Sequence, residues 1–178
     1  MNYNSSECQL SVDGVDFPIQ EPVPFSPVWY SHKFKGPGLR YEVGVCIQTG
    51  WLCWLNGSYP AGKFNDLEIF QLTLKNDLAD GEKVEADAVY LDTSCRVPND
   101  FEGNGAWATM KANVRARHEN INACLKRFKI LNSCFLSSKH RHYLVVQAVA
   151  VIVQSEIMEG RECSQVEYQI IREVQQDV

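Results

Sequence analysis

The feature that most constrains how this chain folds is an alternating segment at residues 10–19, LSVDGVDFPI, which predicts a β-strand. Successive side chains of a strand point to opposite faces. Asp13 therefore shares one face with Val15 and Phe17, whereas Asp16 points to the other. The two aspartates cannot serve one site from the same face. Other segments of the chain are needed to show which of them, if either, is a catalytic residue.

Two further extended segments are predicted to pair as a hairpin. Residues 41–48 alternate in the same way after the glycine- and proline-rich stretch 34–40, FKGPGLR. Residues 51–57, WLCWLNG, follow the turn pair Thr49-Gly50 and predict a third strand. The next loop is expected at residues 58–64.

Helical and extended patterns alternate in the rest of the chain. Asn65 and Glu68 have the spacing of a capping box and predict the start of a helix. Residues 81–91 return to an extended pattern, and residues 109–130 predict a long helix. Residues 143–153, YLVVQAVAVIV, predict a buried helix, with a strand as the alternative because several are β-branched. This order of elements predicts an α/β domain with a mixed sheet.

Composition indicates one globular domain with an uneven distribution of charge. The chain has 178 residues, of which 45% are hydrophobic and 22% charged, and its net charge is -5. Taken alone, a net negative charge argues against a general nucleic-acid binder. Residues 111–129, however, hold six basic residues and one acid, Glu119, so this segment carries +5 and the remainder -10. The basic residues are Lys111, Arg115, Arg117, Lys126, Arg127 and Lys129.

Periodicity leaves two interpretations of Glu119. The long helix carries an apolar stripe, and Glu119 lies roughly 140° from its centre, on a face with Arg115, Asn122 and Lys126. Glu119 is either a solvated residue paired with Arg115, worth about 0.3 kcal/mol, or a carboxylate held near basic groups that guide a polyanion. The stripe itself consists of Val114, His118, Ile121, Leu125 and Phe128, which makes His118 a packed histidine rather than a metal ligand.

The number of cysteines and the hydropathy of the chain predict the cellular compartment of the protein. The seven cysteines are odd in number and form no CxxC pair, and no apolar leader-like segment is seen at the N-terminus. These observations predict reduced thiols in a nuclear or cytoplasmic protein that is not secreted. Residues 143–153 are too few to cross a bilayer, so no membrane association is expected.

Four segments in order resemble a known family. They are VDGVDFPIQEP, WYSHKFKGPGLRYEVGVCIQTG, VEADAVY and RARHENIN, and they are similar to the catalytic domain of DDE superfamily endonucleases, which include Harbinger-type transposases and proteins derived from them. The resemblance covers residues 10–160, between a polar start at 1–9 and a polar tail at 161–178. It implies an RNase H-like fold, in which helices flank a mixed sheet. It also implies DNA as substrate and a carboxylate triad that binds two divalent metal ions, Mg²⁺ or Mn²⁺.

The resemblance assigns the carboxylates one position at a time. The Val-Asp-Gly motif places the first at Asp13 rather than Asp16, EADAVY places the second at Asp87, and RARHEN places the third at Glu119. Asp66 matches a further family aspartate and is an auxiliary metal ligand in this interpretation. Each has an alternative: Asp13 as a strand-end aspartate, Asp87 as an edge-strand charge, and Asp66 as a first-turn helix residue that favours the dipole.

Two functional classes follow from the resemblance. The first is a metal-dependent nuclease with Asp13, Asp87 and Glu119 as catalytic residues, and with four basic residues as DNA contacts: Arg115, Arg117, Lys126 and Arg127. The second is a domesticated, non-catalytic nuclear remnant that binds DNA or protein. It is favoured by Val89, which stands where the family has glycine, and by a match that begins at Leu10 without an upstream DNA-recognition domain. Such a chain would depend on a separate DNA-binding accessory protein.

Overall fold

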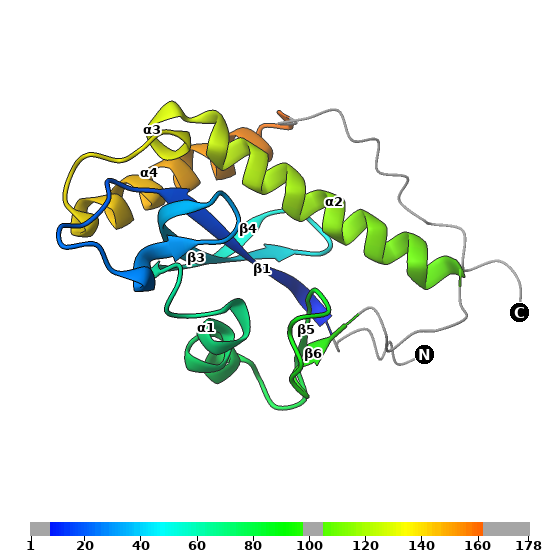
Figure 1. The fold of residues 1–178 in the computed structure, drawn as a ribbon. Coiled ribbons are helices and arrows are strands. Elements are labelled where there is room, and N and C mark those ends of the chain that lie inside the picture. Colours follow the sequence, from blue (N-terminus) through cyan, green and yellow to red (C-terminus); the bar gives the residue numbers. More distant parts are fainter. Residues whose placement is uncertain (1–7, 98–104, 162–178) are drawn as a thin grey trace, which may run out of the picture.

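The computed structural model describes residues 8–97 and 105–161, with side chains from 10 to 97 and from 115 onward. A six-stranded mixed sheet forms the centre of this described part (Figure 1). Its order is β2-β3-β1-β5-β6, and β4 lies outside this order and pairs with the long strand β3. The strands are β1 (Cys8–Pro18), β2 (Tyr30–Ser31), β3 (Gly36–Cys46), β4 (Leu52–Pro60), β5 (Lys83–Glu85) and β6 (Cys95–Arg96).

Helices cover both faces of the sheet, which is the layered arrangement of an RNase H-like fold and confirms the predicted fold class (Figure 1). One face carries the long helices α2 and α4, and the other carries α1. The helices are α1 (Asp66–Leu72), α2 (Gly105–Arg127), α3 (Lys129–Asn132) and α4 (Lys139–Met158), with short 3-10 turns at Pro27–Trp29 and Leu74–Asp77.

The alternation of β1 sorts its side chains between two cores, as the sequence predicts. Val15 and Phe17 are buried against α2 and α4, in a core that includes Tyr41 of β3 and Leu125 of α2. Val12 points the other way, into a smaller core. That smaller core contains Phe70, Leu74, Val84, Tyr90, Cys95 and Val97. Each face of β1 is thus fixed by burial, and a slip of one residue would expose both cores.

The bounds of the strands and helices agree only in part with those predicted from the sequence pattern. The β3–β4 hairpin is confirmed, but β4 continues to Pro60, into the predicted loop. The capping box of Asn65 and Glu68 is confirmed, with both reciprocal hydrogen bonds present. The segment 81–91 forms a strand only at β5, because a turn follows in which the Tyr90 amide donates to the Asp87 carbonyl at 3.0 Å.

The two long helices also differ from the expected bounds. Helix α2 begins at Gly105 rather than residue 109, and it ends at Arg127 because Phe128 has an extended backbone and serves as the N-cap of α3. Residues 143–153 are helical, within α4, which excludes the strand alternative. Within the described residues, no helix is both long and apolar enough to span a membrane.

The cysteines require one correction. Cys46, Cys53, Cys95 and Cys134 are free thiols. Cys124, on α2, is disulfide-bonded, so the prediction of uniformly reduced cysteines is wrong at this position. A disulfide depends on which cysteines meet in space, and the spacing of cysteines along the chain does not reveal that.

A buried histidine on α4 makes the fold sensitive to acid. His142 is fully buried, and its Nδ1 shares a 2.8 Å hydrogen bond with the Tyr41 hydroxyl. Burial lowers the pKa of His142 to about 4 from an ordinary value of 6.5. Between these two pH values the unfolded chain binds a proton that the folded chain does not, so stability is lost as pH falls through this window.

We therefore expect the free energy of unfolding to fall by roughly 3 kcal/mol between pH 7 and pH 4 through this one group, since a pKa unit is worth about 1.4 kcal/mol. In His142→Gln, whose amide oxygen can still accept from Tyr41, that part of the fall should disappear. Urea denaturation at several pH values measures it, with the exposed His140→Gln as control. The same acid dependence in His142→Gln and in the wild type would contradict this assignment.

Candidate active site

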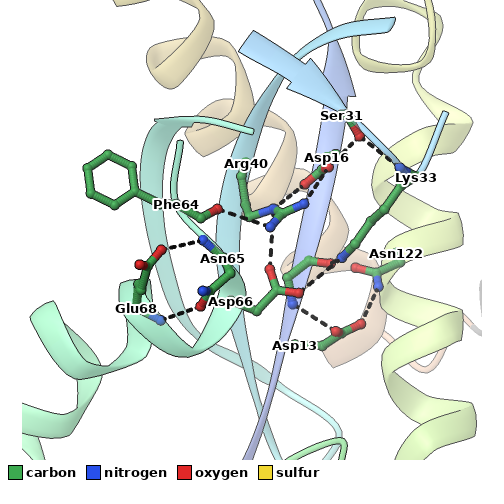
Figure 2. Close-up of polar contacts among 11 residues, drawn as sticks. Asp13, Asp16, Ser31, Lys33, Arg40, Phe64, Asn65, Asp66, Glu68 and Asn122 are labelled. Carbon is green, nitrogen blue, oxygen red and sulfur yellow. Dashed lines mark hydrogen bonds and ion pairs between the residues drawn. The ribbon is translucent and has the colours of Figure 1, made fainter. Parts of the chain in front are cut away.

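Of the two aspartates on β1, Asp16 is committed to a buried ion pair. Its side chain is 1% exposed, and its oxygens accept from Arg40 Nε at 2.7 Å and Arg40 Nη2 at 2.9 Å. The Ser31 hydroxyl donates to the same carboxylate at 2.5 Å, and Arg40 also donates to the Phe64 carbonyl (Figure 2). This bidentate pair joins β1 to β3 and engages both oxygens of Asp16 in buried hydrogen bonds.

Asp13 lies on the opposite face and is far less engaged. It is only half-buried, and one carboxylate oxygen accepts from the Gly14 amide at 2.8 Å. The other oxygen accepts from the Asn122 side chain on α2 at 3.3 Å (Figure 2). Asp13 has no ion pair with a described residue. The structure therefore offers Asp13, and not Asp16, as the carboxylate of β1 that is available for chemistry.

The second predicted carboxylate, Asp87, follows directly from the strand beside Asp13. Strands β1 and β5 are parallel, with Ser11 opposite Glu85, and Asp13 and Asp87 are each two residues further along. The turn after β5 is held by Tyr90, which is buried and packs its ring against Phe70 of α1 at 6.0 Å between centroids. Asp87 itself is exposed and accepts from the Ala88 amide at 2.7 Å.

The third predicted carboxylate, Glu119, points to solvent. Its side chain is 70% exposed and lies 3.3 Å from Arg115 Nε, which is the i,i+4 pair that one of the two interpretations anticipates. The residues of α2 that face Asp13 are Asn122 and His118, which are also four residues apart. His118 is buried as predicted. Burial lowers its pKa, against the opposing effect of the Asp13 charge.

Asp66 sits over the strand next to Asp13. It is the first residue of α1, and a Cβ placed on Gly14 would meet its Oδ1 at 2.0 Å, so a larger residue at position 14 would displace the Asp66 carboxylate. Asp66 lies 3.5 Å from Lys33 Nζ and 3.3 Å from Arg40 Nε (Figure 2). Burial raises its pKa, although both cations act to lower it. The predicted auxiliary carboxylate is thus close to the site but already placed between two cations.

The four predicted DNA contacts have different surroundings. Arg115 is paired with Glu119, and Arg127 is paired with Glu156 of α4. Arg117 lies near the thiol of Cys46 at the end of β3. Lys126 lies close enough to Asp13 for the two charges to interact. The helix face that looks uniformly basic in the sequence therefore divides into two arginines paired with glutamates, one arginine near Cys46 and one lysine at the site.

Three residues that contact Asp13, Gly14 or Asp16 were not predicted to belong to a site. They are Lys33, Arg40 and Asn122. Asn122 and Asp13 are 109 positions apart, and no pattern within α2 marks that contact. Lys33 lies within a segment that resembles the family, WYSHKFK, and that segment is the only signal in the sequence that could have pointed to it.

The three predicted carboxylates are of the chemical type that binds a hard divalent cation, but in this structure they are not gathered around one point. Carboxylate oxygens are the ligands that Mg²⁺ and Mn²⁺ prefer, and the three predicted residues supply them from β1, from the turn after β5 and from α2. Among the described side chains, no three His, Cys, Asp or Glu residues are gathered as a ready metal site. The residue types therefore fit the metal. Asp87 and Glu119 have exposed side chains that can change rotamer.

Comparison with known proteins identifies the family. Residues 12–154 match the family described as DDE superfamily endonuclease, and the match includes Asp13, Asp87 and Glu119. The search of curated proteins and the search of solved structures each found no match. The matched segment contains the whole described sheet except the first residues of β1, together with α1, α2 and most of α4. This chain therefore belongs to the DDE superfamily endonucleases.

Proposed function

We propose that this domain is a divalent-metal-dependent DNA endonuclease of the transposase type, related to the Harbinger branch, and that it works in the nucleus. The observation that carries the proposal is the state of Asp13, the carboxylate of β1 without an ion pair to a described residue. Asp87 follows the neighbouring parallel strand, and Glu119 lies on the helix that contacts Asp13. The family fold, together with Asp13 without an ion pair to a described residue, favours a catalytic domain over a non-catalytic remnant.

The triad would hold one or two Mg²⁺ or Mn²⁺ ions. Bound there, the metal would stabilise the attacking and leaving oxygens of an in-line displacement at a phosphodiester. Asp13 is held by Gly14 and Asn122, which fix its direction. Glu119 is restrained only by an exposed pair with Arg115, and such pairs contribute about 0.2–1 kcal/mol. Turning Glu119 away from Arg115 therefore costs little.

Nicking of supercoiled plasmid tests the function. Wild-type protein with Mn²⁺ or Mg²⁺ should convert supercoiled plasmid to the open circle, and Glu119→Gln should lose this activity by at least about 100-fold, the scale of effects on metal sites. Glu159→Gln is a matched control, because Glu159 is also an exposed glutamate paired with an arginine, Arg161 at 3.2 Å. Equal nicking by wild type and Glu119→Gln would remove Glu119 from the mechanism.

The second candidate is a non-catalytic remnant that binds DNA or protein, with target recognition supplied by an accessory DNA-binding protein. Val89 is the residue that favours it, because the family has glycine there. In this structure, Lys35 is the one described non-glycine residue with a positive φ, so Val89 does not occupy a conformation that requires glycine. A folded wild-type protein that binds DNA but nicks no plasmid would support this candidate.

A further inference from the structure

We propose that Lys33 and Lys126 together hold one backbone phosphate of the DNA beside Asp13, and that they do so without metal. This inference rests on the proposed function, since it names where the substrate backbone sits relative to the proposed catalytic carboxylate. The two lysines come from opposite sides of the site, one from the loop after β2 and the other from α2. Nothing in the chemistry of the triad requires either of them.

Lys33 is held in place by the buried network around Asp16. Its amide donates to Ser31 Oγ at 3.1 Å, and that hydroxyl donates to Asp16. Its ammonium donates to the carbonyl of Gly14, the residue after Asp13, and lies 3.5 Å from Asp66 (Figure 2). Yet the Lys33 side chain remains 41% exposed. Lys33 is thus both positioned next to Asp13 and open to a ligand from solvent.

Lys126 approaches the same place from α2. It lies one helical turn beyond Asn122, the residue that donates to Asp13, and therefore on the same side of the helix. Its ammonium is close enough to Lys33, Asp13 and Asp16 for their charges to act on it. Among the described side chains, residues 10–97 and 115–161, no carboxylate lies within ion-pair distance of Lys126. Its ammonium therefore has no ion-pair partner among those side chains.

The ammonium groups of Lys33 and Lys126 both lie near the carboxylate of Asp13, and their closeness favours binding of an anion. Like charges brought close together repel each other, and a bound anion between them removes that repulsion. A lysine ammonium is a compact charge with three donors, well suited to a phosphate oxygen. Lys33 also lies near Asp66, but its side chain stays exposed beside Gly14, whereas Arg115 and Arg127 are paired with glutamates on the helices. The geometry therefore points to a phosphodiester bound between Lys33 and Lys126.

A double-mutant cycle on metal-free DNA binding tests the inference. The probe is a short fluorescent duplex in EDTA, titrated at several salt concentrations with wild type, Lys33→Gln, Lys126→Gln and the double variant. Each single change should weaken binding about tenfold, and the double change should weaken it little more, because one phosphate held jointly is released when either lysine is lost. The salt slope should fall by about 0.9 once, not twice.

The matched control is Lys83→Gln on β5. Lys83 pairs with Cys8, five residues from Asp13 along β1, and should leave affinity unchanged. Additive losses with a slope that falls twice would place the lysines on separate phosphates and overturn the proposal. Unchanged binding in the single variants, or no metal-free binding by wild type, would overturn it as well. Thermal unfolding by circular dichroism confirms that each variant is folded.

The outcome is separable from that of the proposed function. If the coupled loss of binding is found and wild type nicks no plasmid, the phosphate site stands and the catalytic proposal fails. If nicking depends on Glu119 while the lysine variants bind DNA like wild type, the catalytic proposal stands and the phosphate site fails. Binding in EDTA and nicking with metal thus report on the two proposals independently.

Discussion

Asp13→Asn is expected to abolish Mn²⁺ binding and, with it, plasmid nicking. The substitution keeps the size of the side chain, and its one oxygen can still accept from the Gly14 amide. The contact with Asn122 persists when the Asn122 amide turns so that its oxygen accepts from the new NH2 group. It removes the negative charge that a hard cation needs. Because even residues behind a metal ligand change affinity by about 10- to 100-fold, loss of the central ligand should exceed that range. Titration calorimetry with Mn²⁺ measures the binding, and the plasmid assay measures the activity.

Asp80→Asn provides the comparison, because Asp80 is exposed and lies before β5, away from the site. It should bind Mn²⁺ and nick plasmid as wild type does. If Asp13→Asn retained wild-type affinity for Mn²⁺, Asp13 would not be a metal ligand. If it lost nicking while binding Mn²⁺ normally, Asp13 would act on the DNA rather than on the metal.

The second large effect is on stability, at Arg40. Arg40→Leu leaves Asp16, with a side chain 1% exposed, without its two charged hydrogen bonds. Removing one partner of a buried ion pair costs about 3–5 kcal/mol, because the remaining charge has no compensation. Burial acts to lower the pKa of Arg40, but Asp16 and Asp66 raise it overall, so the guanidinium stays charged. Urea denaturation at pH 7 should show the loss as a lower free energy of unfolding.

Arg115→Leu is the matched control, since it also breaks an arginine–carboxylate pair, but one that is 76% and 70% exposed. It should change the free energy of unfolding by no more than about 1 kcal/mol. The double variant Asp16→Leu with Arg40→Leu should recover much of the loss, because no charge is then left buried and unpaired. A loss below about 1 kcal/mol in Arg40→Leu would show that water reaches Asp16 and compensates its charge.

The elements that could be predicted from sequence are those governed by neighbours along the chain. The alternation of β1 correctly separates Asp13 from Asp16, and the capping box of Asn65 and Glu68 correctly places the start of α1. Boundaries were less predictable. Helix α2 stops where Phe128 turns into an extended backbone, and that turn lets α3 place Leu131 in the core. Such an end is set by packing rather than by a proline or glycine signal.

The candidate site was predictable in its residue types but not in its arrangement. Family resemblance names Asp13 and Glu119. Periodicity left two interpretations of Glu119 open, and the structure shows the exposed pair with Arg115. The contact between Asn122 and Asp13 joins residues far apart in the chain, so it depends on how α2 lies on the sheet. The same holds for Lys33, whose place is fixed by Ser31 and Asp16.

The placement of Asp13 and Asp16 on opposite faces of one eleven-residue strand has a consequence for how this protein can change over time. Selection for a folded, abundant protein acts on Asp16 and Arg40, whereas under the proposed function selection for strand cleavage would act on Asp13. A lineage that gave up cleavage would keep the first pair and let Asp13 drift without losing the fold. The identity of residue 13 among descendants of this gene would then record whether the ancestral chemistry is still in use.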